Sequence, residues 1–399
     1  MATVNPTPAT ETAAGQQSAS ILVHLAALTE SQIENVLANL ITSFAPQELI
    51  ISTSEESAKA SYPTLRIVTA PSSKLSWTLS AADFVQAHQL AREHKAGAIL
   101  ILGPESDSLR VPVLRELARS VVDESIDLAV PRYDLSPRAA LVNSAILYPV
   151  SRSLFASPVR FPMAIDLGLS MRMAERLAIS AQRFTSHNQG DLPVWPVSEA
   201  AVAGFRIAEF EAGQRVIPHP AEPDLHTILP LIAGSLFADI EAKAAFWQRP
   251  RQAHAAQIRS AASGGDGPEL SATDVAPMLQ AFRLAYSNLL EIWSLVLPPN
   301  ALLGLKRLSL TDGAAFRMSE TLWARIVYDF VLAYRLRTIN RGHLLGALIP
   351  LYLAWVASHV NSTASGMDPE RHIEAVAAAF EAEKPYIVSR WRWPDRFNP

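Results

Sequence analysis

The sequence of 399 residues contains no cysteine. This absence excludes disulfide bonds, thiolate metal sites and a cysteine nucleophile, and it fits a reducing compartment such as the cytoplasm. An excess of positive charge is also missing, because 34 Lys and Arg against 38 Asp and Glu give a formal net charge of −4. The chain therefore lacks the broad basic field that would hold nucleic acid or an anionic membrane. We expect a cytoplasmic protein that does not bind nucleic acid.

Residues 1–19 contain no Lys or Arg and no apolar run. This composition does not match a secretory signal, and we expect a disordered tail. A long apolar run extends from Leu344 to Val360. It contains no Lys, Arg, Asp or Glu, and His359 is its one histidine. The run approaches the roughly 20 residues that a membrane span needs. However, Pro350 interrupts it and no basic cluster flanks it consistently, so we expect a buried helix and no membrane span.

The apolar share of 49% and the charged share of 18% are typical of a folded soluble protein, and the length suggests two domains. From Ser20 to Pro131, short apolar runs alternate with longer amphipathic segments. Predicted strands are 21–25, 49–52, 65–68, 98–102 and 127–130, and predicted helices are 31–44, 80–95 and 111–124. Strands that alternate with helices in this way predict right-handed crossovers and a mostly parallel sheet.

The order is looser in the second part of the chain. We expect helices at 136–155, 170–182 and 197–204, a loop at 157–165 and a strand at 205–211. Beyond Asp224 the pattern is helical, with predicted helices at 224–248, 273–296, 318–339, 341–362 and 369–389. The predicted architecture is an α/β domain over residues 20–222, with helices on both faces of a mostly parallel sheet. An α-helical C-terminal domain over 223–399 follows.

The turn Gly103-Pro104-Glu105 follows the apolar strand 98–102 directly. In open α/β sheets, ligands bind just outside the carboxyl ends of the strands. We therefore place the candidate site at this turn.

Several local motifs occur in an order and at spacings that resemble a known family. They are Tyr148-Pro149 with Arg152 three residues later, the segment 159–170 with Pro162 and Asp166, Val194-Trp195 followed by Gly204-Phe205, and Glu383-Lys384-Pro385-Tyr386. Together they resemble GT-A fold glycosyltransferases of the mannosylglycerate and glucosylglycerate synthase group. The resemblance covers roughly residues 20–250 by motif. It implies transfer of a sugar, with retention, from a nucleoside diphosphate sugar to a small glycerate-type acceptor.

The resemblance also implies a metal site. The Asp-x-Asp motif of the family aligns with Gly103-Pro104-Glu105, so Glu105 is the expected ligand, with Asp107 as a substitute and His219 completing the shell. Carboxylate oxygens suit Mg²⁺ or Mn²⁺, either of which would be the cofactor of an active enzyme. The alternatives are a solvated acidic turn and an ordinary loop histidine.

The expected nucleotide or phosphate ligands are Lys74, Arg132 and Tyr133. Lys74 matches the lysine of a Gly-Lys-Gly loop in the family, although Leu75 replaces its second glycine. Arg132 and Tyr133 follow the fifth predicted strand, and an arginine there can meet a phosphate or carboxylate with two hydrogen bonds. The alternatives are a surface lysine and an arginine that pairs with Asp134.

The expected catalytic carboxylates are Asp166 and Asp191. Asp166 matches the aspartate of the Gly-Gly-Asp motif in the family, although Ala164 and Ile165 replace both glycines. A further family carboxylate falls at Pro193, and Asp191 is near it but out of register.

Two functions follow from the resemblance. The first is an active transferase with an altered metal site. The second is a catalytically inactive homologue that acts as a binding or regulatory partner, which the replacements at Gly103, Leu75, Ile165 and Pro193 favour. The apolar helix faces in the second half leave a homodimer open.

Overall fold

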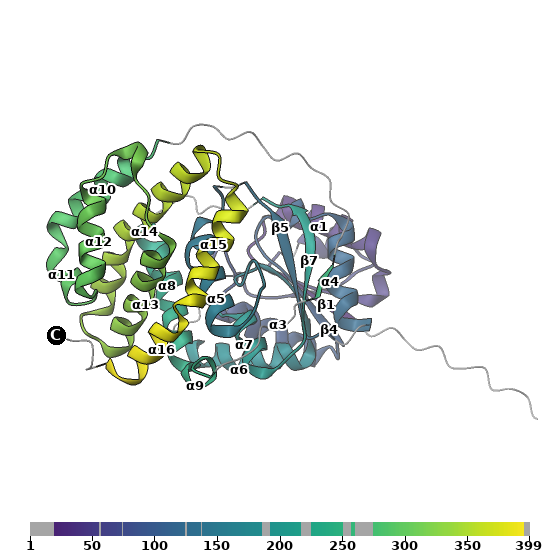
Figure 1. Ribbon diagram of the computed structural model, residues 1–399. Helices are drawn as coiled ribbons and strands as arrows, with labels where there is room; N and C mark the ends of the chain where they lie inside the picture. Colours follow the sequence, from purple (N-terminus) through teal and green to yellow (C-terminus); the bar gives the residue numbers. More distant parts are fainter. Residues whose placement is uncertain are drawn as a thin grey trace, which may run out of the picture.

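A computed structural model describes residues 20–55, 57–73, 75–123, 126–136, 138–185, 192–216, 225–249, 257–259 and 274–394. Within these ranges the strands form one eight-stranded sheet in the order β3-β2-β1-β4-β6-β5-β7-β8 (Figure 1). The strands are β1 Ile21–Leu25, β2 Leu49–Thr53, β3 Arg66–Thr69, β4 Ala98–Leu102, β5 Leu128–Asp134, β6 Asp166–Ser170, β7 Ile207–Gln214 and β8 Gln257–Arg259. The predicted tail at 1–19 lies outside the described residues.

The sheet is mostly parallel, as predicted. Strand β6 is the exception, because it runs antiparallel to both β4 and β5. Every residue of β1, β2 and β4 is buried, as expected of parallel strands that are covered on both faces. Figure 1 shows α1 (Glu30–Ser43) and α4 (Val111–Asp123) on one face, and α3 (Ala81–Glu93) and α6 (Met171–Thr185) on the other.

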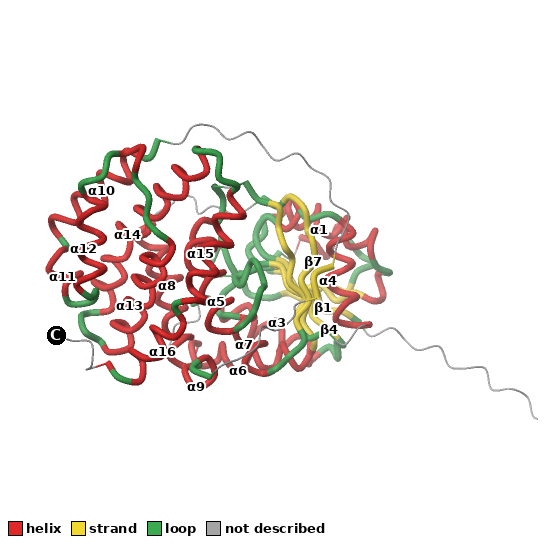
Figure 2. Tube along the Cα trace, in the orientation of Figure 1, coloured by secondary structure: helices red, strands yellow, loops and turns green. Residues whose placement is uncertain are grey.

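Most of the remaining helices gather beside the sheet, as Figure 2 shows in red. They are α5 Tyr148–Phe155, α7 Pro196–Ala203, α8 Leu225–Ala242, α9 Ala244–Trp247, α10 Ala276–Asn288, α11 Leu290–Ser294, α12 Pro299–Ser309, α13 Glu320–Leu336, α14 Arg341–Ala364, α15 Pro369–Ala382 and α16 Lys384–Arg392. The short helix α2 (Ser57–Ser61) lies against α1. The α/β fold class and the helical second half are thus confirmed. The predicted domain boundary at 222/223 falls within residues 217–224, which are not described.

The structure differs from the sequence prediction in two elements that bear on the site. Residues 166–169 had no predicted structure, but Asp166–Ser170 form the central strand β6. The predicted helix 136–155 is present from residue 141 to 155, but it begins later than predicted and contains a π-helical turn at Asn143–Leu147 before α5.

Two hydrophobic cores hold the fold together. One packs around the sheet, and the other lies among the helices of the second half. Helix α5 belongs to the second core, through Val150, Leu154 and Phe155. It is therefore the element by which the chain preceding β6 packs against α15.

Helices α8 and α14 are long and apolar enough to cross a membrane by length and composition. In α14, which contains the apolar run at 344–360, 78% of the apolar window is buried inside the fold. Leu344, Leu348 and Trp355 of this helix pack in the second core. A buried core helix, as predicted from the sequence, accounts for this burial.

Candidate functional site

The candidate site lies where β4 ends. Because β6 runs antiparallel to β4, its first residue, Asp166, pairs with Leu102 at the carboxyl end of β4. The backbone N–H of Gly103 donates to Asp166 Oδ1 at 3.2 Å. The antiparallel strand therefore places a carboxylate at the turn that the sequence identified.

Asp166 is fully buried and forms an ion pair with Arg215. Arg215 Nε lies 3.0 Å from Asp166 Oδ2 and its Nη2 lies 3.3 Å from Oδ1, with both side chains at 0% exposure. Burial opposes the charged guanidinium, but the charge and hydrogen bonds of Asp166, together with Tyr133 and Glu105, outweigh burial and raise the pKa of Arg215. A charge this deeply buried is stable in the fold only when it is paired and hydrogen-bonded.

Arg215 also binds the turn itself. Its Nη2 donates to the carbonyl oxygen of Pro104 at 2.7 Å, and its Nη1 donates to the carbonyl oxygen of Glu105. Nη1 further donates to Ser108 Oγ at 3.2 Å and to the carbonyl oxygen of Val216. All hydrogen-bond donors of the guanidinium are thus paired with protein acceptors. Through these bonds Arg215 links the turn to Asp166.

Tyr133, predicted to bind nucleotide, lies inside the same network. It is 7% exposed, and its hydroxyl donates to Asp166 Oδ2 at 2.7 Å. Burial, followed by the charge of Asp166, raises the pKa of Tyr133 well above its ordinary value. Asp166 therefore accepts hydrogen bonds from Gly103, Tyr133 and Arg215 and presents no oxygen to solvent, so neither it nor Tyr133 faces a ligand in this structure.

Gly103 and Ile165 pack tightly against each other. A Cβ atom added to Gly103 would lie 2.7 Å from the carbonyl oxygen of Ile165 and 2.9 Å from its Cβ. No side chain fits at position 103 while Ile165 keeps this place. The shorter of these two contacts is with the backbone of Ile165, and its side chain accounts for the other.

The predicted metal ligands do not form a site within the described residues. Glu105 has a left-handed backbone, with φ at 60°, and its carbonyl is held by Arg215. Asp107 has a buried Oδ1 without a hydrogen-bond partner. Over the described ranges, no three His, Asp or Glu side chains lie close enough to hold a metal ion. His219, the third predicted ligand, lies outside the described residues.

Arg132 remains at the rim of the site. It is 35% exposed, and its Nε lies 3.7 Å from Oε1 of Glu211 on β7. The partner is thus Glu211 rather than the Asp134 considered from the sequence. This long and half-exposed pair leaves Arg132 accessible to a ligand. Lys74 and Asp191, the other predicted site residues, lie outside the described residues.

Sequence reasoning missed Arg215, the central residue of the site. It directly follows β7, in the same strand-end position that drew attention to Arg132. The predicted strand ended at Glu211, three residues early, so Arg215 was not recognised as a strand-end cation. A correct strand length would have identified it.

A second polar network lies at the ends of β1 and β2. His24 Nδ1 and Ser52 Oγ are 3.1 Å apart, and His24 Nε2 lies 3.7 Å from Asp83 Oδ1. Burial alone would raise the pKa of Asp83, but His24 and the hydrogen bonds from Ser80 lower it. Ser52 is fully buried, which excludes it as an accessible nucleophile. Asp83 also accepts from Ser73 Oγ at 3.0 Å, so the network anchors the segment that leads to Lys74.

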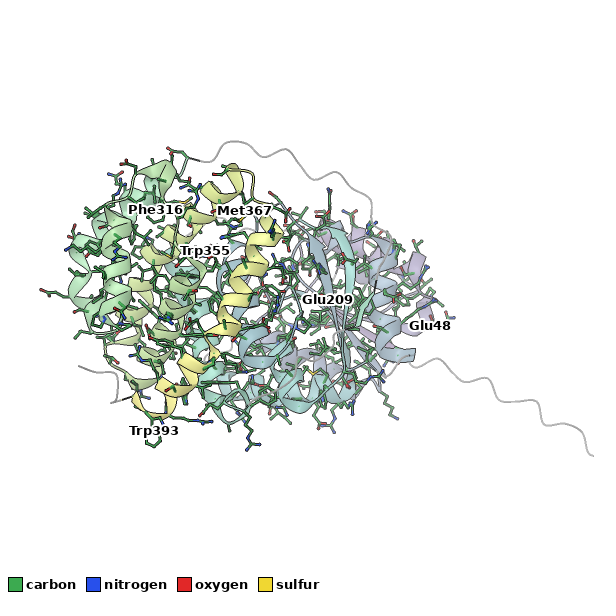
Figure 3. All side chains as sticks on the ribbon, viewed as in Figure 1. Glu48, Glu209, Phe316, Trp355, Met367 and Trp393 are labelled. Carbon is green, nitrogen blue, oxygen red and sulfur yellow. The ribbon has the colours of Figure 1, made fainter. Side chains whose placement is uncertain are left out.

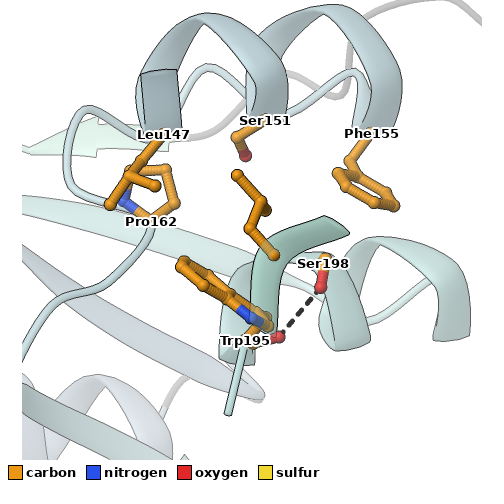
Figure 4. Close-up of a pocket in the computed structure, with 7 residues that line it drawn as sticks. Leu147, Ser151, Phe155, Pro162, Trp195 and Ser198 are labelled. Atoms are coloured by element: carbon orange, nitrogen blue, oxygen red, sulfur yellow. Dashed lines mark hydrogen bonds between the residues drawn. The ribbon is translucent and has the colours of Figure 1, made fainter. Parts of the chain in front are cut away.

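A small cavity lies away from the turn, between α5, α7 and α8 (Figure 4). Ser151 and Trp195 line it, and Ser151 Oγ and Trp195 Nε1 are both buried without a hydrogen-bond partner. Ser198 Oγ donates to the carbonyl oxygen of Trp195 at 3.0 Å. The cavity has room for about one water molecule, so it cannot hold a sugar.

No protein-family model matches the chain, and no curated protein matches it. The solved structures similar to this chain include glucosyl-3-phosphoglycerate synthase from Mycobacterium tuberculosis in complex with phosphoglyceric acid, and the same enzyme with Mn²⁺, uridine-diphosphate-glucose and phosphoglyceric acid. Each aligns with 56% of this chain and 79% of its own, at 15% identity and a TM-score of 0.38. A further mycobacterial protein aligns with 56% of this chain and 74% of its own, at 12% identity and a TM-score of 0.38. Values this low do not place the chain in a family.

Proposed function

We propose that this chain is a glycosyltransferase-like protein that binds a nucleoside diphosphate sugar, and a small glycerate-type acceptor, without a divalent metal at the turn that follows β4. The nucleotide would lie at the carboxyl edge of β1, β2 and β4. The cytoplasmic location and the homodimer stay predictions.

The observation that carries this proposal is the Arg215–Asp166 pair. Both carboxylate oxygens of Asp166 are taken by protein donors, and the turn carbonyls of Pro104 and Glu105 are bound to the same guanidinium. A hard divalent cation needs several free oxygen ligands. Asp166 and these two carbonyls do not offer them, and no three His, Asp or Glu side chains of the described residues lie close enough together to hold a metal ion.

Among the predicted phosphate ligands that the structure describes, Arg132 is an accessible cation at this edge, which supports its role as a diphosphate ligand. A guanidinium can bind two phosphate oxygens at once, and the half-exposed contact with Glu211 costs little to break. The charge of Arg132 would compensate part of the diphosphate charge that a metal otherwise neutralises.

Calorimetric titration with UDP, GDP, ADP and their glucose conjugates tests the proposal, with each ligand measured in EDTA and in Mn²⁺. We expect at least one to bind with equal affinity in both. Arg132→Gln should weaken that binding about tenfold, which corresponds to one lost charged contact. Arg172→Gln is the matched control, because Arg172 pairs with Asp127 at the opposite, amino end of β5. Binding that requires Mn²⁺ would contradict the metal-free site.

A second candidate function, the inactive homologue, is favoured by the closed state of the turn. Arg215, Tyr133 and Asp166 satisfy one another fully, as structural networks do. Failure of every nucleotide to bind in the titration would support this second function over the first.

A further inference from the structure

Arg160 lies where the sheet meets the helices of the second half, and it is 6% exposed. Its Nε and Nη2 donate to the carboxylate of Glu370 on α15 at 3.2 and 3.1 Å, and Nη2 also donates to Ser144 Oγ at 3.1 Å. Its guanidinium carbon lies 5.1 Å from the ring centre of Tyr148 and 5.0 Å from that of Phe161. Its Nη1 is buried and has no hydrogen-bond partner.

Glu209 on β7 contacts the same arginine and is 1% exposed. Its Oε1 accepts the backbone N–H of Arg160 at 2.6 Å, whereas its Oε2 is buried without a partner. Burial raises the pKa of Glu209. Figure 3 labels Glu209 at the junction of the sheet and the helical region.

These two buried atoms have opposite hydrogen-bonding needs. Arg160 Nη1 requires an acceptor, and Glu209 Oε2 requires a donor when the carboxylate is ionised. Buried polar groups are rarely left unpaired, and each unpaired group costs about 1–3 kcal/mol. A hydroxyl group accepts one hydrogen bond and donates another, so it carries both functions that these two atoms lack.

The surrounding backbone is unusual at this place. The π-helical turn Asn143–Leu147 carries Ser144 to the guanidinium, and Asn143 Nδ2 donates to the carbonyl oxygen of Arg160 at 2.9 Å. Single π-helical turns occur frequently at functional sites. The turn therefore holds Arg160 from both its side chain and its backbone.

We propose that Arg160 and Glu209 form a site for a hydroxyl group of a small sugar or polyol, at the contact between β7 and α15. The rings of Tyr148 and Phe161 supply the apolar surface that such a ligand needs beside its polar contacts. Glu370 covers the guanidinium but is itself 56% exposed, so its displacement opens a path to the site. The site does not depend on nucleotide binding at the β4 turn.

Ligand-observed saturation-transfer NMR with glycerol and with glucose, on the full chain without nucleotide, tests the site. Saturable binding is expected for the unmodified protein, with at least a tenfold loss of affinity in Arg160→Gln. Arg160→Lys keeps a charge for Glu370 but lacks the second donor, and it should lose affinity similarly. Arg160→Lys replaces Arg160→Gln in the test if the glutamine variant does not fold.

Arg152→Gln is the matched control. Arg152 pairs with Glu374 and Glu381 of α15, so its replacement loosens the same helix without touching the two unpaired atoms. Its affinity should stay within twofold of the unmodified protein. Equal losses in the Arg152 and Arg160 variants, or no saturable binding, would overturn the site.

A crystal structure with bound glycerol or glucose locates the ligand directly. The expected result is a ligand oxygen within hydrogen-bond distance of both Arg160 Nη1 and Glu209 Oε2. One ordered water at that position, not displaced by either ligand, would show a structural water instead and would overturn the proposal.

Discussion

Arg215 and Asp166 form an ion pair that is completely shielded from solvent at the end of the central strand β4, with Nε and Oδ2 3.0 Å apart. The pair joins three segments that are distant in sequence, because Arg215 also binds the carbonyl oxygens of Pro104 and Glu105. Its first consequence is structural. The carboxylate that the sequence suggested for catalysis holds the strand ends together.

Arg215→Met should therefore destabilise the fold by about 3–5 kcal/mol, the usual cost of leaving a buried charge unpaired. Arg132→Gln, at the same edge of the sheet, should cost less than about 1 kcal/mol, because its pair with Glu211 is half-exposed. Denaturant unfolding of both variants measures the difference. Equal losses would mean that Arg215 contributes no more than a surface contact.

Gly103→Ala should destabilise the protein by about 1–3 kcal/mol, the typical cost of overpacking. The added Cβ would meet the carbonyl oxygen and the Cβ of Ile165. Ile165→Gly removes one of these contacts, so the double variant should be more stable than the sum of the two single losses predicts. A double-mutant cycle measures this coupling, and strict additivity would show that the two positions do not pack together.

Tyr133→Phe should cost about 1 kcal/mol of stability, because Asp166 loses one of its hydrogen bonds. The affinity for any nucleotide that binds should remain within twofold, since the hydroxyl faces Asp166 rather than the rim. Calorimetry on the variant checks this expectation. A tenfold loss would restore the nucleotide contact predicted from the sequence.

Stability should fall as the pH rises from about 4 to about 7 through Asp329 on α13. Burial raises its pKa to about 7 against the opposing effects of Arg390 and Tyr386, whereas its ordinary value is 3.8. The folded state thus binds a proton more tightly than the unfolded state in this window, and that stabilisation is lost on deprotonation. Asp329→Asn should flatten the dependence of unfolding free energy on pH. An unchanged slope would assign the dependence to other groups.

The elements predicted from the sequence are those whose buried residues follow one another along the chain. Strand β4 is a five-residue apolar run between amphipathic helices, and β1 has the same length with His24 as its one polar residue. Their parallel pairing follows from the alternation of strands and helices. Strand β6 was not predicted from the sequence, because it begins with Asp166 and Gly168 interrupts its apolar residues. Only its position between β4 and β5 makes it a strand.

The sequence predicted the position of the candidate site in the sheet, but it did not predict the side-chain contacts found there. The turn at Gly103 was identified, because strand ends determine where ligands bind. The pairing of Asp166 with Arg215 spans 49 residues, and no local pattern reveals it. The steric link between Gly103 and Ile165 likewise depends on the antiparallel strand.

Manganese binding, followed by electron paramagnetic resonance of the free ion, tests the central claim most directly. The protein is measured alone and with the nucleotide that binds best, against a protein-free control for nucleotide–metal binding. The account predicts that the protein removes no Mn²⁺ from solution in either state. Stoichiometric Mn²⁺ binding that Glu105→Ala or His219→Ala abolishes would contradict it.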